Sequence, residues 1–216
     1  MKNKLIIFDL DGTIVDSKEG ILNGARYALD KMGIKNESLP NLMRFIGPPL
    51  SYSFSVFYNM SDDLQVEAVK YYREFYDDIG GKQLYVYEGM IDLLKELHEY
   101  GFRLAIASAK VDYAVKNVAN NIGVSQLFEI IAGSIPNGRR SAKDELSKYV
   151  IDEIGFSGNY DDIYFIGDSK TDFIGADKLG LNFIAALYDR EESEFEGCDI
   201  KYKAFSVNEL RDILLS

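Results

Sequence analysis

Five short apolar runs in this chain are continuous rather than alternating, and this pattern restricts the choice of fold more than any other. Strands that are apolar on both faces are typical of a parallel sheet covered by helices on each side. Amphipathic helical patterns separate the later runs, and strand–helix repetition predicts an α/β fold with right-handed crossovers. The predicted strands are Leu5–Leu10, Arg103–Ser108, Glu129–Gly133, Ile163–Gly167 and Phe183–Leu187, with helices at Val111–Ile122, Ala142–Ile154 and Thr171–Leu179.

The regular spacing is interrupted once, between the first and second strands. Most of this interval has helical periodicity, so a helical domain inserted into the α/β domain is the simplest arrangement. We predict a Rossmann-like three-layer core, with a mostly parallel sheet of five or more strands, formed by residues 1–15 and 86–216, and a helical cap at 16–85. The helices expected in this interval are Ser17–Met32, Leu50–Tyr58, Asp62–Asp77 and Glu88–Tyr100.

The charge of the chain restricts its partners. Its 216 residues include 24 Lys and Arg against 35 Asp and Glu, a formal net charge of −11. A nucleic-acid backbone would be repelled by this field, and no local basic patch offsets it. No segment approaches the roughly 18 apolar residues that a transmembrane helix needs. We therefore expect neither a nucleic-acid nor a membrane partner.

Two features bear on the cellular compartment. The single cysteine, Cys198, has no partner for an internal disulfide, which fits a reducing environment. The apolar run near the amino terminus stops at Asp9, shorter than the core of a typical signal peptide. A cytoplasmic location is the expectation.

Polar side chains gather where the predicted strands end. In an open parallel sheet, ligands bind beyond the carboxyl ends of the strands. Carboxylates brought together there repel one another unless a cation lies among them, and hard oxygen ligands suit Mg²⁺. A lysine among them implies an anion, so the pattern predicts a metal site beside an anion site. The residues concerned are Asp9, Asp11, Thr13, Ser108, Lys143, Asp168 and Asp172.

These motifs resemble those of the haloacid dehalogenase-like superfamily. The sequence "DLDGT", a hydroxyl after the second strand, a lysine before the fourth strand and "GDSKTD" after it match the four motifs of that superfamily over essentially the whole chain. The helical insertion is similar to the cap of its phosphoglycolate phosphatase-like and 5′-nucleotidase-like branch.

The resemblance implies a role for each matching residue. Asp9 would be the nucleophile that forms an aspartyl-phosphate, and Asp11 the general acid and base. The Asp9 carboxylate, the Asp11 backbone carbonyl and Asp168 would hold Mg²⁺, with Asp172 acting directly or through water. The phosphoryl oxygens would be bound by Thr13, Ser108 and Lys143.

Some assignments stay open at this point. Many relatives have proline directly after the motif lysine, whereas Asp144 follows Lys143, so Lys110 is the alternative. Arg139 or Arg140 would face the substrate or lie in a surface loop. In the cap, "RFIGPPL" resembles a substrate-reading loop, with Arg44, Gly47 and Pro48 as specificity residues; the alternative is a simple helix breaker.

The predicted function is a Mg²⁺-dependent phosphatase acting on small phosphorylated metabolites, such as phosphoglycolate or nucleoside 5′-monophosphates. Two alternatives remain: a phosphomutase with the same aspartyl-phosphate, and a non-catalytic protein that senses phosphate. The intact set of Asp9, Asp11 and Asp168 argues against the second. The sequence does not indicate whether the chain is a monomer or a dimer.

Overall fold

The computed structural model describes residues 4–135, 140 and 142–216. The chain separates into two compact units: a core unit, residues 1–16 and 86–216, and a helical unit, residues 17–85. The two connecting segments, β2 (Val15–Asp16) and β3 (Tyr85–Val86), pair as a two-stranded sheet.

The core unit is built on a parallel sheet. Its described residues form six strands in the order β5-β4-β1-β6-β7-β8, and every adjacent pair is parallel. Ile7 of the central strand is level with Ala105 on one side and Phe165 on the other. The strands are β1 (Leu5–Phe8), β4 (Arg103–Val111), β5 (Ile130–Ser134), β6 (Ile163–Gly167), β7 (Asn182–Ala186) and β8 (Tyr202–Ala204).

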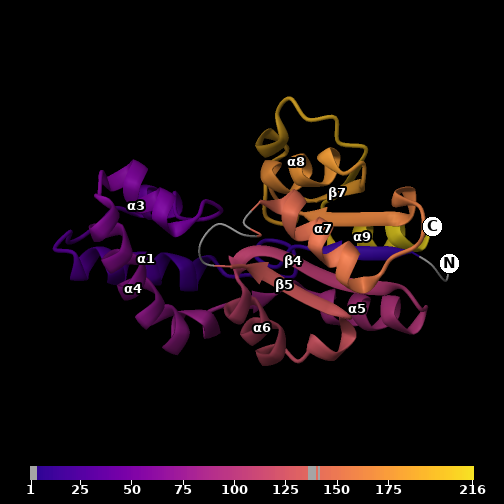
Figure 1. Ribbon diagram of the computed structural model, residues 1–216, viewed down its shortest axis with the longest axis horizontal. Helices are drawn as coiled ribbons and strands as arrows, with labels where there is room; N and C mark the ends of the chain where they lie inside the picture. The colour runs from indigo at the N-terminus through magenta and orange to yellow at the C-terminus, as the bar shows by residue number, and fades with distance from the viewer. Residues whose placement is uncertain (1–3, 136–139, 141) are drawn as a thin grey trace. The chain divides into compact units, whose positions relative to one another are not determined.

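Helices cover both faces of this sheet, and α5 and α6 lie on the opposite side from α7 and α8 (Figure 1). Leu5 and Ile7 are fully buried and pack in one cluster with Leu146 and Val150 of α7 and Ala176 of α8. The central strand β1 is therefore apolar along its whole length, because helices cover both faces of the sheet and all four of its side chains are buried. The helices are α5 (Met90–Glu99), α6 (Asp112–Asn121), α7 (Lys143–Ile154), α8 (Lys170–Lys178) and α9 (Val207–Leu215).

The predicted α/β, Rossmann-like fold is confirmed, although several element boundaries differ. The first strand ends at Phe8 rather than Leu10, and β4 continues three residues beyond Ser108 to Val111. The last strand and helix, β8 and α9, were not predicted. The three-residue β8 lies at the sheet edge and exposes Lys203, so it lacks a continuous apolar run.

The helical unit has its own apolar core. Described residues of α1 (Lys18–Lys31), α3 (Leu50–Tyr58) and α4 (Asp62–Asp78) contribute to it, together with the short α2 (Leu39–Met43), which was not predicted. Leu29, Leu42 and Phe54 are fully buried in this cluster.

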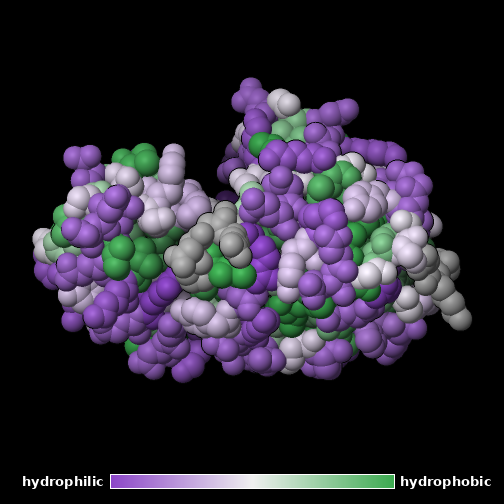
Figure 2. All heavy atoms as spheres, viewed as in Figure 1, coloured by the Kyte–Doolittle hydropathy of each residue, from purple (hydrophilic) through white to green (hydrophobic). Residues whose placement is uncertain are grey.

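The face of the molecule in Figure 2 is largely hydrophilic, as expected when apolar strands and helix faces are buried inside each unit. Among the residues that the structure describes, no helix has the length and apolar character needed to cross a membrane.

Candidate active site at the carboxyl ends of the strands

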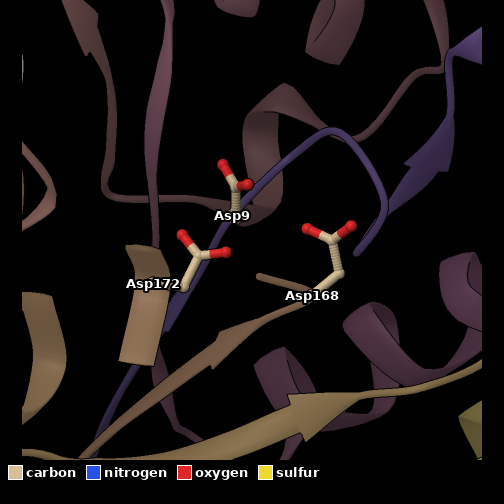
Figure 3. Close-up of side chains that lie close together, drawn as sticks. All are labelled: Asp9, Asp168 and Asp172. Carbon is tan, nitrogen blue, oxygen red and sulfur yellow. The ribbon is translucent and has the colours of Figure 1, made fainter. Parts of the chain in front are cut away.

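Three buried carboxylates lie together where β1 and β6 end (Figure 3). The Asp9 N–H donates to the Ile166 carbonyl at 2.9 Å, which extends the parallel ladder one residue beyond β1. Asp168 directly follows β6, and Asp172 lies in the first turn of α8. Asp9, Asp168 and Asp172 each present an oxygen within 4.8 Å of the others. The sheet thus brings together acids that are far apart in sequence.

Lys143 joins two of these acids. It is the first residue of α7, and its Nζ lies 2.7 Å from Asp9 Oδ1 and 2.7 Å from Asp172 Oδ1. Close packing of α7 on α8 makes this possible, because a Cβ added to Gly175 would lie 2.4 Å from the Lys143 Cβ. The lysine is almost fully buried, and its charge is balanced by the two carboxylates.

Asp172 is also held by the start of its own helix. Its Oδ2 accepts hydrogen bonds from the Ser169 backbone N–H at 3.1 Å and the Ser169 hydroxyl at 2.6 Å. Ser169 Oγ in turn accepts from the Asp172 N–H, which completes a capping box at the start of α8. Both Asp172 oxygens therefore contact protein donors, so this residue fixes the position of Lys143 and of the helix end.

The chain turns sharply after Asp9. Gly12 has a φ of +82°, and a Cβ at this position would lie 2.0 Å from Asp168 Oδ2. Glycine is therefore required both by the backbone conformation and by the close approach of the Asp168 carboxylate. The first strand was predicted to extend to Leu10, but it ends at Phe8, and Asp11 lies in this turn beyond it.

Asp11 contacts Lys110, whose Nζ lies 2.7 Å from Asp11 Oδ2. Lys110 reaches this position because β4 continues past Ser108. Lys110 and Lys143, the two alternatives from the sequence, therefore contact different acids: Lys143 meets Asp9 and Lys110 meets Asp11.

The two predicted hydroxyl residues are buried. Ser108 lies within β4, and its Oγ accepts a hydrogen bond from the Lys110 N–H at 3.3 Å. Thr13 lies in the turn after β1, and its Oγ1 is buried with no hydrogen-bond partner among the described residues. A buried hydroxyl of this kind is available to a ligand oxygen.

Arg190 is a part of the site that the sequence did not reveal. It lies in the segment between β7 and the short helix η4 (Glu192–Phe195), and its Nε and Nη2 each lie 2.8 Å from Asp168 Oδ2. No motif marks an arginine in such a loop. Its only sequence signal is its place just after a strand end, where ligands bind in parallel sheets.

Burial controls the protonation of these groups. It raises the pKa of Asp9 to about 6, opposed by Lys143 and supported by the charge of Asp172. Burial and the neighbouring Asp172 raise the pKa of Asp168 to about 7, opposed by Arg190. Burial disfavours the charged form of Lys143, but Asp172 and Asp9 outweigh it and raise the pKa of Lys143 above its usual value. Carboxyl groups shifted in this way are typical of functional sites.

This donor set fits a hard divalent cation. Asp9, Asp168 and Asp172 supply only oxygen atoms, close enough together to share one ion. Among the described residues of the site, four carboxylates face three cationic side chains, which leaves one net negative charge when all are ionised. A divalent cation would reverse that charge, and the site would then attract an anion.

Three further residues singled out from the sequence, Arg44, Gly47 and Pro48, belong to the helical unit. The Arg44 guanidinium stacks 3.7 Å from the centre of the Phe57 ring, and Gly47 has a φ of +103°.

Two arginines precede α7 in the sequence, and the first of them, Arg139, lies outside the described residues. Arg140 stacks on the Tyr149 ring, and its Nη2 lies 3.7 Å from Asp112 Oδ1.

Comparison with known proteins agrees with this geometry. Residues 6–186 match the family model described as haloacid dehalogenase-like hydrolase. The chain therefore belongs to the haloacid dehalogenase-like hydrolase family and is an enzyme of the hydrolase class.

Similar proteins carry different activity names. A 5′-nucleotidase from Pseudomonas aeruginosa is 34% identical over 183 residues, covering 85% of this chain and 82% of its own. A tyrosine-protein kinase, PtkA, from Mycobacterium tuberculosis is 27% identical, covering 98% and 72%. The crystal structure of a provisionally named phosphatase from Clostridium acetobutylicum has a TM-score of 0.90 and 34% identity, covering 100% of this chain and 99% of its own.

Proposed function

We propose that this hydrolase is a Mg²⁺-dependent phosphatase that cleaves small phosphate monoesters through an aspartyl-phosphate on Asp9. The observation that carries the proposal is the position of Asp9. Its carboxylate is buried at the end of the central strand, 2.7 Å from the Lys143 ammonium and within 4.8 Å of oxygens of Asp168 and Asp172. A fixed carboxylate beside an ammonium group, next to acids that would hold a metal ion, is suited to attack a phosphoryl group, whose transfer depends on positioning and charge stabilisation.

In the first step, an Asp9 oxygen forms a bond to phosphorus while the bond from phosphorus to the leaving oxygen breaks. Asp11 gives its proton to the leaving oxygen. Lys143 holds Asp9 in the orientation for attack, and Thr13 and Ser108 bind phosphoryl oxygens. The buried, unpartnered Thr13 hydroxyl supports this role.

In the second step, water attacks the same phosphorus and gives a proton to Asp11. The bond between phosphorus and Asp9 breaks, which releases inorganic phosphate and restores both carboxyl groups. Lys110, 2.7 Å from Asp11, keeps this carboxyl at the edge of the site through both steps.

Asp9 and Asp168, with the Asp11 carbonyl, would hold Mg²⁺, while Asp172 keeps Lys143 and the α8 terminus in place. An ion held by these residues would neutralise charge on the phosphoryl oxygens. Phosphate monoester hydrolysis is among the slowest uncatalysed reactions, so stabilisation of charge contributes strongly to its acceleration.

For the substrate, the name of the Pseudomonas relative favours nucleoside 5′-monophosphates. Phosphoglycolate is the second candidate, because the motifs resemble that branch of the family. The Mycobacterium relative has a kinase name, so transfer of the phosphoryl group to an acceptor other than water must also be measured.

The test is hydrolysis of p-nitrophenyl phosphate, nucleoside 5′-monophosphates and phosphoglycolate, with Mg²⁺ and with EDTA. We expect Mg²⁺-dependent release of phosphate, and a loss of at least about a thousandfold in kcat for Asp9→Asn, because the nucleophile is removed. Asp152→Asn makes the same chemical change on the exposed side of α7 and is expected to keep full activity.

Activity that persists in EDTA or in Asp9→Asn would contradict this mechanism. A requirement for a bisphosphate activator, or transfer of phosphate to an acceptor in preference to water, would instead indicate a phosphomutase or another transferase.

A further inference from the structure

We propose that Arg190 sets the charge balance of the site, so that it weakens binding of the divalent cation and strengthens binding of phosphate. The inference deepens the proposed phosphatase function and rests on it. Its consequence is that the cation binds firmly only together with a phosphorylated substrate.

The contact between Arg190 and Asp168 is short and specific. The guanidinium Nε and Nη2 each lie 2.8 Å from the same oxygen, Asp168 Oδ2. The side chain of Arg190 is 22% exposed and that of Asp168 is 4% exposed, so water screens the pair weakly. Arg190 therefore places a positive charge directly beside a carboxylate of the proposed metal site.

Arg190 and a cation can occupy the site at the same time. Asp168 Oδ2, which contacts Arg190, also faces Gly12, where a Cβ would lie 2.0 Å away. Figure 3 shows one oxygen of Asp168 directed toward Asp9 and Asp172. A cation bound between Asp9 and Asp168 need not displace the guanidinium, so the charge of Arg190 remains nearby when the cation binds.

The segment that carries Arg190 is anchored. The Tyr188 ring packs edge-on against the Tyr87 ring with 5.1 Å between their centres. The Leu187 N–H donates to the Ala204 carbonyl at 2.8 Å. These contacts hold the backbone just before Arg190, so its side chain starts from a fixed point.

The sign of the effect follows from Coulomb's law. Arg190 repels a divalent cation and attracts a phosphate dianion, so loss of its charge moves the two affinities in opposite directions. Lys143 and Lys110 contact the other acids and remain in place. A purely structural role for Arg190 has a different signature, because damage to the site weakens both ligands together.

The experiment measures binding by calorimetry on full-length protein stripped of metal, first with Mg²⁺ alone and then with inorganic phosphate at saturating Mg²⁺. For Arg190→Gln, which keeps a hydrogen-bond donor but removes the charge, we expect about tenfold tighter Mg²⁺ binding and about tenfold weaker phosphate binding. Arg190→Lys keeps the charge and should stay near wild type for both.

Arg103→Gln is the matched control. Arg103 forms a comparable arginine–carboxylate pair with Glu129, at 2.6 Å, where β4 begins at the opposite end of the sheet. Arg103→Gln removes one positive charge, as Arg190→Gln does, and we expect its affinities for Mg²⁺ and for phosphate to match those of the wild type.

Weaker or unchanged Mg²⁺ binding in Arg190→Gln, in a wild type that binds both ligands, would overturn this inference and leave the phosphatase proposal intact. The same holds if Arg190→Lys behaves like Arg190→Gln. A wild-type protein that binds neither Mg²⁺ nor phosphate would overturn both proposals.

Discussion

Asp9 and Asp172 both contact Lys143, but the structure supports them differently. Asp9 is crowded by the other acids, and burial raises its pKa. Its ionised form therefore destabilises the folded protein when no metal is bound. Asp172 instead accepts hydrogen bonds from the backbone N–H and the hydroxyl of Ser169, in addition to its ion pair with Lys143. The same acid-to-amide change is therefore expected to have opposite effects on stability at these two positions.

In EDTA at pH 7, we expect Asp9→Asn to be as stable as wild type or more stable. The substitution relieves repulsion between Asp9 and the neighbouring carboxylates, while Lys143 retains its ion pair with Asp172. Asp172→Asn should lose about 1–3 kcal/mol, since an amide cannot satisfy both Lys143 and the start of α8. Urea unfolding of the three proteins measures the difference. A clear loss of stability in Asp9→Asn would show that its ion pair outweighs the crowding.

Arg103 links β4, the segment just before β5, and α7. Its Nε and Nη2 donate to the two Glu129 carboxylate oxygens, just before β5, at 2.9 and 2.6 Å. Its Nη2 also donates to the carbonyl of Ile154, the last residue of α7. This hydrogen-bonded arginine lowers the pKa of Glu129, so the pair stabilises the fold when Glu129 is ionised.

Glu129→Gln is therefore expected to cost about 0.5–1 kcal/mol at pH 7, a modest value because Glu129 is partly exposed. The pKa of Glu129 is lower in the folded state, so the contribution is fully present above the unfolded pKa. It is lost as the pH falls below about 4.5. Urea unfolding at several pH values should show a constant difference between pH 7 and 5.5 that shrinks at lower pH. A difference that persists at pH 3 would mean that packing, rather than charge, is responsible.

The strands that could be predicted share one physical property, burial on both faces of the sheet. β6 matches its predicted range, Ile163–Gly167, and its residues Ile163, Phe165 and Ile166 are fully buried. The short edge strand β8 lacks this burial and was missed. The helix α9 was also missed, although Val207, Leu210 and Leu214 are buried at helical spacing. The strand-end acids could be predicted because parallel strands bring them together. Arg190 could not, since its role depends on the path of a loop that no periodicity encodes.

For the whole molecule, the two units are expected to respond differently to Mg²⁺. All the proposed ligands lie in the core unit, residues 1–16 and 86–216. A ligand that binds only the folded state stabilises it by about 2.7 kcal/mol at a hundred times its dissociation constant. The helical unit, residues 17–85, contributes none of these ligands and has its own apolar core.

Amide hydrogen exchange with and without Mg²⁺ measures this difference directly. We expect exchange to slow in β1 and β6, whose ends carry Asp9 and Asp168, and to change little in α1 and α4. Asp168→Asn should abolish the slowing, because a ligand of the ion is lost, while Asp152→Asn, at an exposed position of α7, should retain it. Exchange in β1 and β6 that does not respond to Mg²⁺ would contradict a metal site at these strand ends. Equal slowing in α1 and α4 would show that the two units unfold as one, so that the binding energy stabilises the whole chain.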